Sequence, residues 1–118
     1  MPTTSRRDPG KRQRQVLERR IQSALTTIYD PATPNIDLFN MGMVYSIQVN
    51  ADGVVEIEMA YSSPGHPGYL GLPRRVECTI NELEGVSQCR VKVVAEPAWT
   101  MDRVSDHARI NMSADNYE

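Results

Sequence analysis

The chain has 118 residues, of which 40% are hydrophobic and 24% are charged, and its formal net charge is −2. This length suits one compact domain, and the charged fraction together with eight prolines argues against a coiled coil. No stretch approaches the roughly 20 apolar residues of a transmembrane helix, and the basic N-terminus lacks the apolar segment of a secretory signal. We therefore expect a single cytoplasmic domain without a membrane span.

Charge is distributed unevenly along the chain. Residues 1–20 carry seven basic and two acidic side chains, whereas residues 21–118 carry six basic and thirteen acidic ones. A basic arm on an acidic body can bind nucleic acid or an acidic partner surface. No aromatic residue precedes Tyr29, so the arm offers no platform for stacking bases. Nucleic-acid binding is not expected, and the role of the arm stays open.

The first element is predicted to be an amphipathic helix. Asp8 followed by Pro9 is typical of a helix start, and apolar residues recur at helical spacing from Leu17 onwards. Pro31 disfavours helical geometry at the preceding residue, so the helix is expected to end near Tyr29. Residues 30–40 are predicted to form an irregular connection.

Two alternating runs then predict an antiparallel hairpin. In the first run Tyr45, Ile47 and Val49 share one face, and the second run alternates in the same way over residues 55–61. Residues 50–53 supply the short Asx/Gly turn between them. One face of this hairpin should be buried and the other should face solvent.

The second half of the chain predicts a helix, a strand and a last short helix. Apolar residues at helical spacing indicate a helix from about Leu72 that ends at Gly85. Residues 89–93 alternate as a third strand. Thr100 is placed to cap a final helix, with Asp102 in its first turn.

The element order α-β-β-α-β-α predicts an α+β fold: two layers, with a three-stranded sheet covered by helices on one face. The other face of the sheet should expose polar residues, and the opposite charges among them can pair across strands: Gln48, Glu56, Glu58, Arg90 and Lys92. The predicted organisation is a flexible basic arm over residues 1–10, one domain over 11–112 and a flexible tail over 113–118.

One loop is favoured as a site by its position. Residues 62–68, Ser-Ser-Pro-Gly-His-Pro-Gly, follow the second strand and precede the second helix, whose N-terminus offers free backbone N–H groups. The alternative interpretation is a rigid Pro/Gly turn with capping serines. Trp99, the sole tryptophan, is in the same way more typical of a sealed core edge than of a ligand site.

No catalytic arrangement is evident. His66 and His107 are the only histidines, and neither lies in a metalloprotease or nucleophile-elbow motif. Cys78 and Cys89 have no metal-binding spacing and are interpreted as small buried hydrophobes in a reducing compartment. Because no nucleophile–base pair can be assembled, we do not expect an enzyme.

Several segments together resemble the PaaD/SufT-like metal–sulfur (iron–sulfur) cluster assembly domains. Asp30–Pro34 and Asn40–Val44 are similar to the family's "DPE-x-P … DLG-[LIM]-V" signature, and Ser62–Pro67 is similar to its "T-S-P-G-C-P" loop. Leu83–Val86 matches the helix end before the third strand, and Pro97–Ser105 resembles the closing motif "P-x-W-T-x-[DE]-x-[IM]-S". The resemblance covers roughly residues 14–112.

The resemblance implies an adaptor or carrier in iron–sulfur cluster assembly or metalloenzyme maturation, working with a metalloenzyme subunit or with assembly factors. It also implies that the loop carries the metal or thiol site, but the family's loop cysteine is His66 here and the aspartate of "DLG" is Asn40. A thiolate suits iron–sulfur clusters better than a neutral imidazole does. We expect no tightly bound cofactor and at most a transient iron or iron–sulfur cluster.

These residues lead to three hypotheses. The first is a maturation adaptor that docks through the loop and the closing motif. The second is an iron carrier that binds metal through His66, and the third is a non-catalytic regulatory subunit of an enzyme complex. The candidate residues are Ser62, Ser63, Gly65, His66 and Asn40 for the metal or partner-binding loop, and Pro97, Trp99, Thr100 and Asp102 for partner docking. The client, the metal and a homodimeric state stay open.

Overall fold

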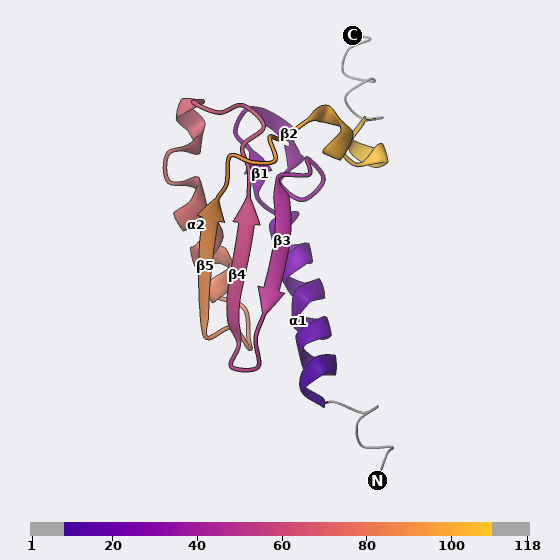
Figure 1. Ribbon diagram of the computed structural model, residues 1–118, viewed down its shortest axis with the longest axis vertical. Helices are drawn as coiled ribbons and strands as arrows, with labels where there is room; N and C mark the ends of the chain where they lie inside the picture. Colours follow the sequence, from indigo (N-terminus) through magenta and orange to yellow (C-terminus); the bar gives the residue numbers. More distant parts are fainter. Residues whose placement is uncertain (1–8, 110–118) are drawn as a thin grey trace.

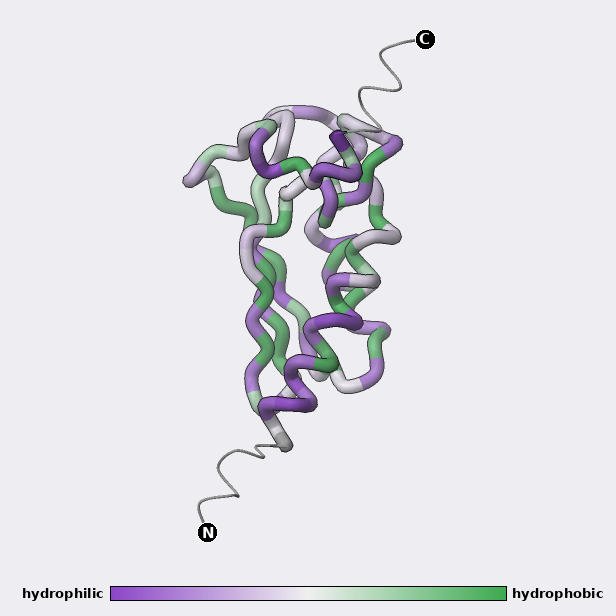
Figure 2. Tube along the Cα trace, turned by 90° about the vertical axis from the view of Figure 1, so that its right-hand side faces the viewer, coloured by the Kyte–Doolittle hydropathy of each residue, from purple (hydrophilic) through white to green (hydrophobic). Residues whose placement is uncertain are grey.

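The computed structural model describes residues 9–109 and has the two predicted layers, with a sheet on one side and helices on the other (Figures 1 and 2). The elements, in chain order, are α1 (Pro9–Leu25), β1 (Tyr29–Asp30), β2 (Thr33–Asp37), β3 (Val44–Val49), β4 (Val54–Met59), the 3₁₀ turn η2 (Pro67–Tyr69), α2 (Leu72–Asn81), β5 (Gln88–Val93) and the 3₁₀ turn η3 (Met101–Arg103). The predicted α+β fold is confirmed. Pro9 and Gly10, which the domain assignment placed in the arm, are the first residues of α1; Asp8 lies outside the described residues.

The main sheet has the strand order β3-β4-β5, so β4 is its central strand. β3 and β4 are antiparallel and form the predicted hairpin. β5 runs parallel to β4, because α2 carries the chain back across the sheet between them. The two edge strands are β3 and β5, and each contacts a helix: α1 packs against β3, and α2 packs against β5.

The core lies between the sheet and the helices. Each element contributes the residues that its apolar spacing predicted: Leu17, Ile21 and Leu25 from α1, Val55, Ile57 and Met59 from β4, and Leu72, Val76 and Ile80 from α2. Figure 2 shows the alternation of hydropathy along the strands. Complete burial of one such side chain stabilises the fold by about 1.5–3 kcal/mol, so these stripes hold the layers together.

The outer face of the sheet carries the predicted charges, but they are not ion-paired. Glu56 lies directly opposite Arg90, and Glu58 lies opposite Lys92. Within residues 9–109, however, neither of these two pairs comes within the 4.0 Å of an ion pair, whereas Arg109 lies 3.9 Å from Asp102. The charges on the sheet are therefore a solvated surface, which contributes little to stability.

The outer edge of β5 is covered by side chains of α2. The Cys89 N–H donates to Asn81 Oδ1 at 2.8 Å, and the Val91 N–H donates to Glu77 Oε2 at 2.9 Å. Two backbone donors that would otherwise face solvent at a sheet edge are thus paired. Such pairing protects an edge strand from adding a further strand.

Two predictions about the strands were wrong. Residues 30–40 are not irregular, because β1 and β2 form a small antiparallel sheet within them. Tyr45 does not share the inner face of Ile47, because the register shifts between Val44 and Ser46 and leaves it as an extra residue. The bulge turns Tyr45 toward the C-terminal segment, where its hydroxyl donates to Pro97 O at 2.7 Å.

Three predictions about the helical elements were also wrong. α2 ends at Asn81 rather than at Gly85, because the N–H groups of Leu83 and Val86 donate three residues back and form turns instead of a further α-helical turn. α1 ends at Leu25 rather than near Tyr29, because the hydroxyls of Thr26 and Thr27 bond to backbone carbonyls of the last turn. Thr100 stands at the N-cap position of η3 but makes no side-chain cap bond. The chain then turns, and Ser105 Oγ accepts from the Ala108 N–H at 3.2 Å as the next helical turn begins.

The C-terminal segment is fastened to the loop before β3 through three consecutive backbone carbonyls. Asn40 O accepts from the Ser105 N–H at 2.8 Å, Met41 O from Trp99 Nε1 at 2.7 Å and Gly42 O from Arg103 Nε at 2.8 Å. The Arg103 guanidinium also lies 3.9 Å above the Tyr45 ring. This arrangement leaves no room for a side chain at Gly42, which has φ +72° and whose Cβ would overlap the Arg103 backbone.

Gly42→Ala should therefore lower the free energy of unfolding more than Gly65→Ala does. Both glycines have positive φ, but a Cβ at Gly65 would meet nothing within 4 Å. Gly65→Ala should cost about 1–2 kcal/mol for the backbone alone. Gly42→Ala should cost about 1–3 kcal/mol more for the overlap. Urea unfolding followed by Trp99 fluorescence measures both, and equal losses would contradict the close packing of Arg103 on Gly42.

Candidate functional site

The loop that follows β4 is anchored by Asp30, a residue that is completely buried. Ser62 Oγ donates to Asp30 Oδ2 at 2.8 Å, and the Tyr69 hydroxyl donates to Asp30 Oδ1 at 2.9 Å. The Ala32 N–H donates to Oδ1 as well, at 3.1 Å. Since a buried carboxyl without donors is costly, these three bonds explain how β1 can place one inside the fold.

Tyr69 closes the loop on its far side. Its hydroxyl lies 2.9 Å from Ser62 Oγ and accepts from the Ser63 N–H at 3.3 Å, while its ring stacks on Tyr61 at 4.2 Å between centroids. Burial raises the pKa of Tyr69, and the bond to the Asp30 carboxyl raises it further. The hydroxyl therefore stays protonated at neutral pH and remains a donor to Asp30.

His66 serves the loop as a backbone cap. The Gly68 N–H donates to His66 Nδ1 at 2.9 Å, at the start of η2. A neutral imidazole that accepts at Nδ1 carries its proton at Nε2. Neither nitrogen then offers a free lone pair: a metal at Nδ1 would displace Gly68, and a metal at Nε2 would move the proton to Nδ1, against the Gly68 donor.

The other loop candidates have different surroundings. Ser62 is half-buried on Asp30, whereas Ser63 and Gly65 are exposed. Asn40 does not join the loop, because its backbone and side-chain N–H groups donate to the two oxygens of Asp37, at 2.9 and 2.7 Å. Within residues 9–109, no hydrogen bond links Asn40 to His66. The structure thus separates Asn40 from the loop with which the sequence grouped it.

The predicted docking motif is partly used inside the fold. Trp99 is half-buried, its indole N–H is bound to Met41 O, and its ring packs against the core. Pro97 O accepts from Tyr45. Thr100 and Asp102 are exposed, and Asp102 faces Arg109 at 3.9 Å. Trp99 therefore seals the edge of the core, as the alternative interpretation held, while Thr100 and Asp102 remain accessible.

The loop and the docking motif meet at one groove. It has a volume of about 390 Å³ and is lined by residues of the loop and of the segment after β5: Ala60, Tyr61, Ser62, Pro64, Val93, Val94, Ala95, Ala98 and Trp99. None of these side chains is charged. Two segments that the sequence proposed separately, around Ser62 and around Trp99, thus form the walls of one neutral surface.

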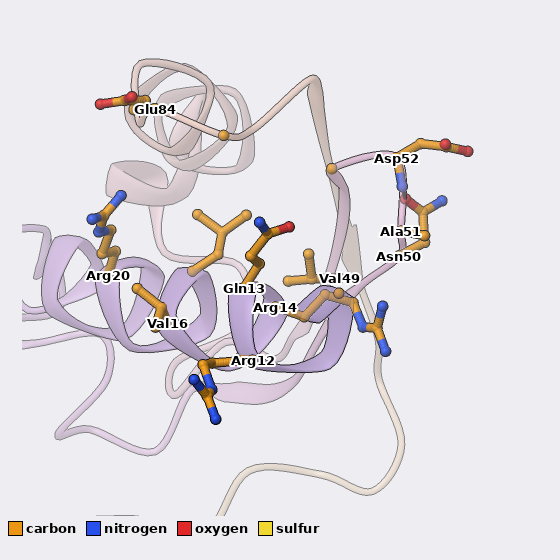
Figure 3. Close-up of a pocket in the computed structure, with 14 residues that line it drawn as sticks. Arg12, Gln13, Arg14, Val16, Arg20, Val49, Asn50, Ala51, Asp52 and Glu84 are labelled. Atoms are coloured by element: carbon orange, nitrogen blue, oxygen red, sulfur yellow. Dashed lines mark hydrogen bonds between the residues drawn. The ribbon is translucent and has the colours of Figure 1, made fainter. Parts of the chain in front are cut away.

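A larger groove of about 580 Å³ lies elsewhere, between the first turns of α1 and the turn after β3 (Figure 3). Its rim carries Arg12, Arg14 and Arg20 from α1, and Asp52 and Glu84 from the two neighbouring turns. The rim bears charges of both signs, and none of the predicted site residues lines it. This groove therefore gives no indication of a particular ligand charge.

Neither cysteine joins the loop. Cys78 is exposed on α2, and Cys89 is buried in β5. Burial, and to a lesser extent the charge of Glu77, raise the pKa of Cys89 to about 11, so this thiol stays protonated at neutral pH. The interpretation as a small buried hydrophobe holds for Cys89 and is wrong for Cys78. In the described part of the chain, no group of three or more His, Cys, Asp or Glu residues could hold a metal ion.

Sequence reasoning missed Asp30 and Tyr69 as members of the site. Asp30 was considered only as the residue before Pro31 and as part of the family signature, and Tyr69 was not singled out. The available signal was the Asp30–Pro31 pair of the family signature, where an acidic residue stands between two predicted elements. No local spacing indicates that residues 30, 62 and 69 meet, because the contact depends on the packing of β1 beside the end of β4.

The sequence profile of the iron–sulfur cluster assembly proteins matches residues 18–93, more than half of the chain. The chain belongs to this family. Relatives include the Fe-S protein maturation auxiliary factors YitW of Bacillus subtilis and SufT of Staphylococcus aureus. YitW is 31% identical over 81% of this chain and 93% of its own length, and SufT is 31% identical over 70% and 93%. A similarly named factor of Porphyromonas gingivalis is 28% identical over 80% of this chain and 90% of its own.

Solved structures show the same fold. A domain of unknown function, DUF59, from Bacillus anthracis superposes with a TM-score of 0.80 at 24% identity, over 87% of this chain and 97% of its own. A conserved hypothetical protein from Thermotoga maritima gives 0.67 at 27% identity, over 78% and 89%. In the described part of this family member, no helix is long and apolar enough to cross a bilayer.

Tyr69→Phe should destabilise the family member, while Tyr61→Phe should not. Removal of the Tyr69 hydroxyl takes one of three donors from the buried Asp30 carboxyl, which should cost about 1–3 kcal/mol. Tyr61 stacks on the same ring, but no hydrogen bond within residues 9–109 involves its hydroxyl, so loss of that hydroxyl should change stability by less than about 0.5 kcal/mol. Urea unfolding of both variants measures the difference. Similar losses of stability in the two variants would mean that packing of the tyrosine rings, and not the bond to Asp30, determines the stability of the site.

The native protein should react with a thiol reagent at one cysteine per chain at neutral pH. Cys78 is exposed, whereas Cys89 is buried and protonated until the pH approaches about 11. The reaction of Cys89 should therefore accelerate as the pH rises, and both thiols should react at once when urea unfolds the protein. Titration with Ellman's reagent measures the number. The Cys78→Ala variant should show no fast thiol in the native state, and a fast reaction at its Cys89 would contradict the assigned burial.

Proposed function

We propose that this protein is a non-catalytic adaptor in the maturation of iron–sulfur proteins. It docks on a client metalloenzyme or on an assembly factor through the groove between the loop of residues 62–68 and the segment of residues 94–99. The observation that carries this proposal is the groove itself. It is lined by the two segments that resemble family motifs, and no lining side chain is charged. Hydrogen bonds to Asp30 and to Met41 O fix the positions of its walls.

The names of the relatives support the proposed pathway. The three proteins described above are called Fe-S protein maturation auxiliary factors, and each matches this chain over at least nine-tenths of its own length. An auxiliary factor can act by binding a partner without chemistry of its own. The site agrees with that role, since its serine and tyrosine hydroxyls both donate to the Asp30 carboxyl, and this carboxyl is completely buried, so the bonds hold the loop in place.

The proposed adaptor does not bind the cluster or iron itself; the partner protein supplies the ligands. His66 uses Nδ1 to hold Gly68, and within the described residues it belongs to no group of three or more His, Cys, Asp or Glu side chains that could hold a metal ion. A cluster bound here would need ligands from the partner and would first have to break the cap. We therefore infer that His66 shapes the loop and that the metal is cargo of the proteins to which this one binds.

The two roles of His66 can be separated by substitution. Asn at this position keeps a side-chain acceptor for the Gly68 N–H but removes the imidazole, whereas Ala removes both. In a strain that lacks the gene, His66→Asn should restore the activity and iron content of iron–sulfur enzymes as the wild type does. His66→Ala should restore them less well, because the loop loses its cap.

The outcomes distinguish the hypotheses. If both variants fail to restore activity while remaining folded, the imidazole itself is needed and the iron-carrier hypothesis gains. If the deletion leaves all iron–sulfur enzymes active, the maturation role is wrong, and a regulatory subunit becomes the better hypothesis. Circular dichroism and the urea midpoint serve as controls for folding of each variant.

A further inference from the structure

The outer edge of β5 is covered along most of its length and is open at its end. In a parallel pair, alternate residues of a strand direct their backbone groups to the neighbouring strand and the others direct them outward. Cys89 and Val91 are outward residues, and α2 pairs their N–H groups through Asn81 and Glu77. Val94 is an inward residue, since its N–H donates to Met59 O at 2.8 Å.

Val93 must therefore direct its backbone N–H outward, as Cys89 and Val91 do. No side chain of α2 pairs with it, and no hydrogen bond to its N–H is present within residues 9–109. Its side chain is 38% exposed, although it belongs to the face of the sheet that is buried elsewhere. At this point α2 no longer covers the strand, and a polar backbone group stands next to an apolar surface.

The neutral groove begins at the same place. Val93, Val94 and Ala95 form one of its sides, and Pro64 and Trp99 stand among its other walls. An incoming segment would find both an unpaired backbone donor and a pocket for one apolar side chain. The electrostatics agree, because a groove without any charged lining residue is best complemented by a neutral side chain.

We propose that an extended, apolar segment of a partner protein adds as a strand to the open end of β5 and places one uncharged side chain in the groove. Main-chain hydrogen bonds at Val93 supply affinity and the groove supplies selectivity, as in other cases of strand addition. Asn81 and Glu77 fix the position of the added strand, because they block the edge further along β5. This inference rests on the proposed function and specifies the class of partner segment.

The experiment selects ligands for the full chain from a phage-displayed library of short random peptides. Selected peptides should be rich in β-branched and aromatic residues, without charge at the central position. In the free protein the Val93 amide should exchange with deuterium faster than those of Cys89 and Val91, and a bound peptide should slow the exchange of Val93 and leave the other two unchanged. Two-dimensional NMR of labelled protein reads each amide separately.

Ala98→Arg tests the groove, because it puts a charge among neutral lining residues at an exposed position. It should weaken the selected peptides by about tenfold or more, about 1.4 kcal/mol. Gln88→Arg is the matched control: it adds the same charge at an exposed residue at the other end of β5 and should leave binding unchanged. The urea midpoints of both variants should stay near that of the wild type.

Several outcomes would overturn the inference. They are failure to select any peptide, binding that leaves the Val93 amide unprotected, and equal affinity of Ala98→Arg and Gln88→Arg. A dimer in solution in which Val93 is already protected would assign the edge to a second copy instead. The proposed function is judged separately: if peptides bind as described but Ala98→Arg still restores iron–sulfur enzymes in the deletion strain, the edge binds strands while maturation proceeds without it.

Discussion

A buried carboxyl group fixes the candidate site. Asp30 accepts hydrogen bonds from Ser62, Tyr69 and Ala32, so it ties together β1, the end of β4 and the turn before α2. In the interior each of these bonds is stronger than in water, and the loss of one leaves a buried carboxyl oxygen with fewer donors. If the loop moved away from β1, Asp30 would either become exposed to solvent or lose its hydrogen-bond donors. The close approach of Gly68 to Pro31 depends on this arrangement, since a Cβ at Gly68 would overlap the Pro31 side chain.

A second set of bonds brings the C-terminal segment to the same end of the sheet. The carbonyls of Asn40, Met41 and Gly42 hold Ser105, Trp99 and Arg103, so the chain crosses the ends of the strands instead of leaving the domain after β5 (Figure 1). One wall of the groove thus depends on Asp30 and another on the loop before β3. Two lining residues, Ser62 and Trp99, use their polar atoms in these bonds, so the shape of the groove is fixed while its apolar lining stays available to a partner.

Periodicity was sufficient for the layers and insufficient for the contacts that define the site. Alternation over β3 and β4 and helical spacing from Leu72 to Ile80 are local signals, so the sheet and the helix that covers it could be predicted. The bulge at Tyr45 and the short sheet β1–β2 depend on tertiary partners, Pro97 and the end of the main sheet, which no local pattern reveals. The same holds for the site: the loop was found by its turn residues, whereas Asp30, 32 residues before Ser62, was not. Asn40 was grouped with the loop through motif resemblance alone, and its side chain instead caps Asp37.

The residue at position 66 shows how a family scaffold can be kept while its chemistry changes. In the family pattern this position is a cysteine, whose thiol is a weak hydrogen-bond acceptor and a soft metal ligand. Here an imidazole nitrogen accepts from the Gly68 N–H and closes the turn that leads to Tyr69 and Asp30. The substitution thus exchanges ligand capacity for a fixed loop. A protein whose task is to present a surface gains from that exchange, whereas one that must hand over a cluster through this residue would lose its function. The geometry of His66 therefore supports the proposal that this residue shapes a loop for partner recognition.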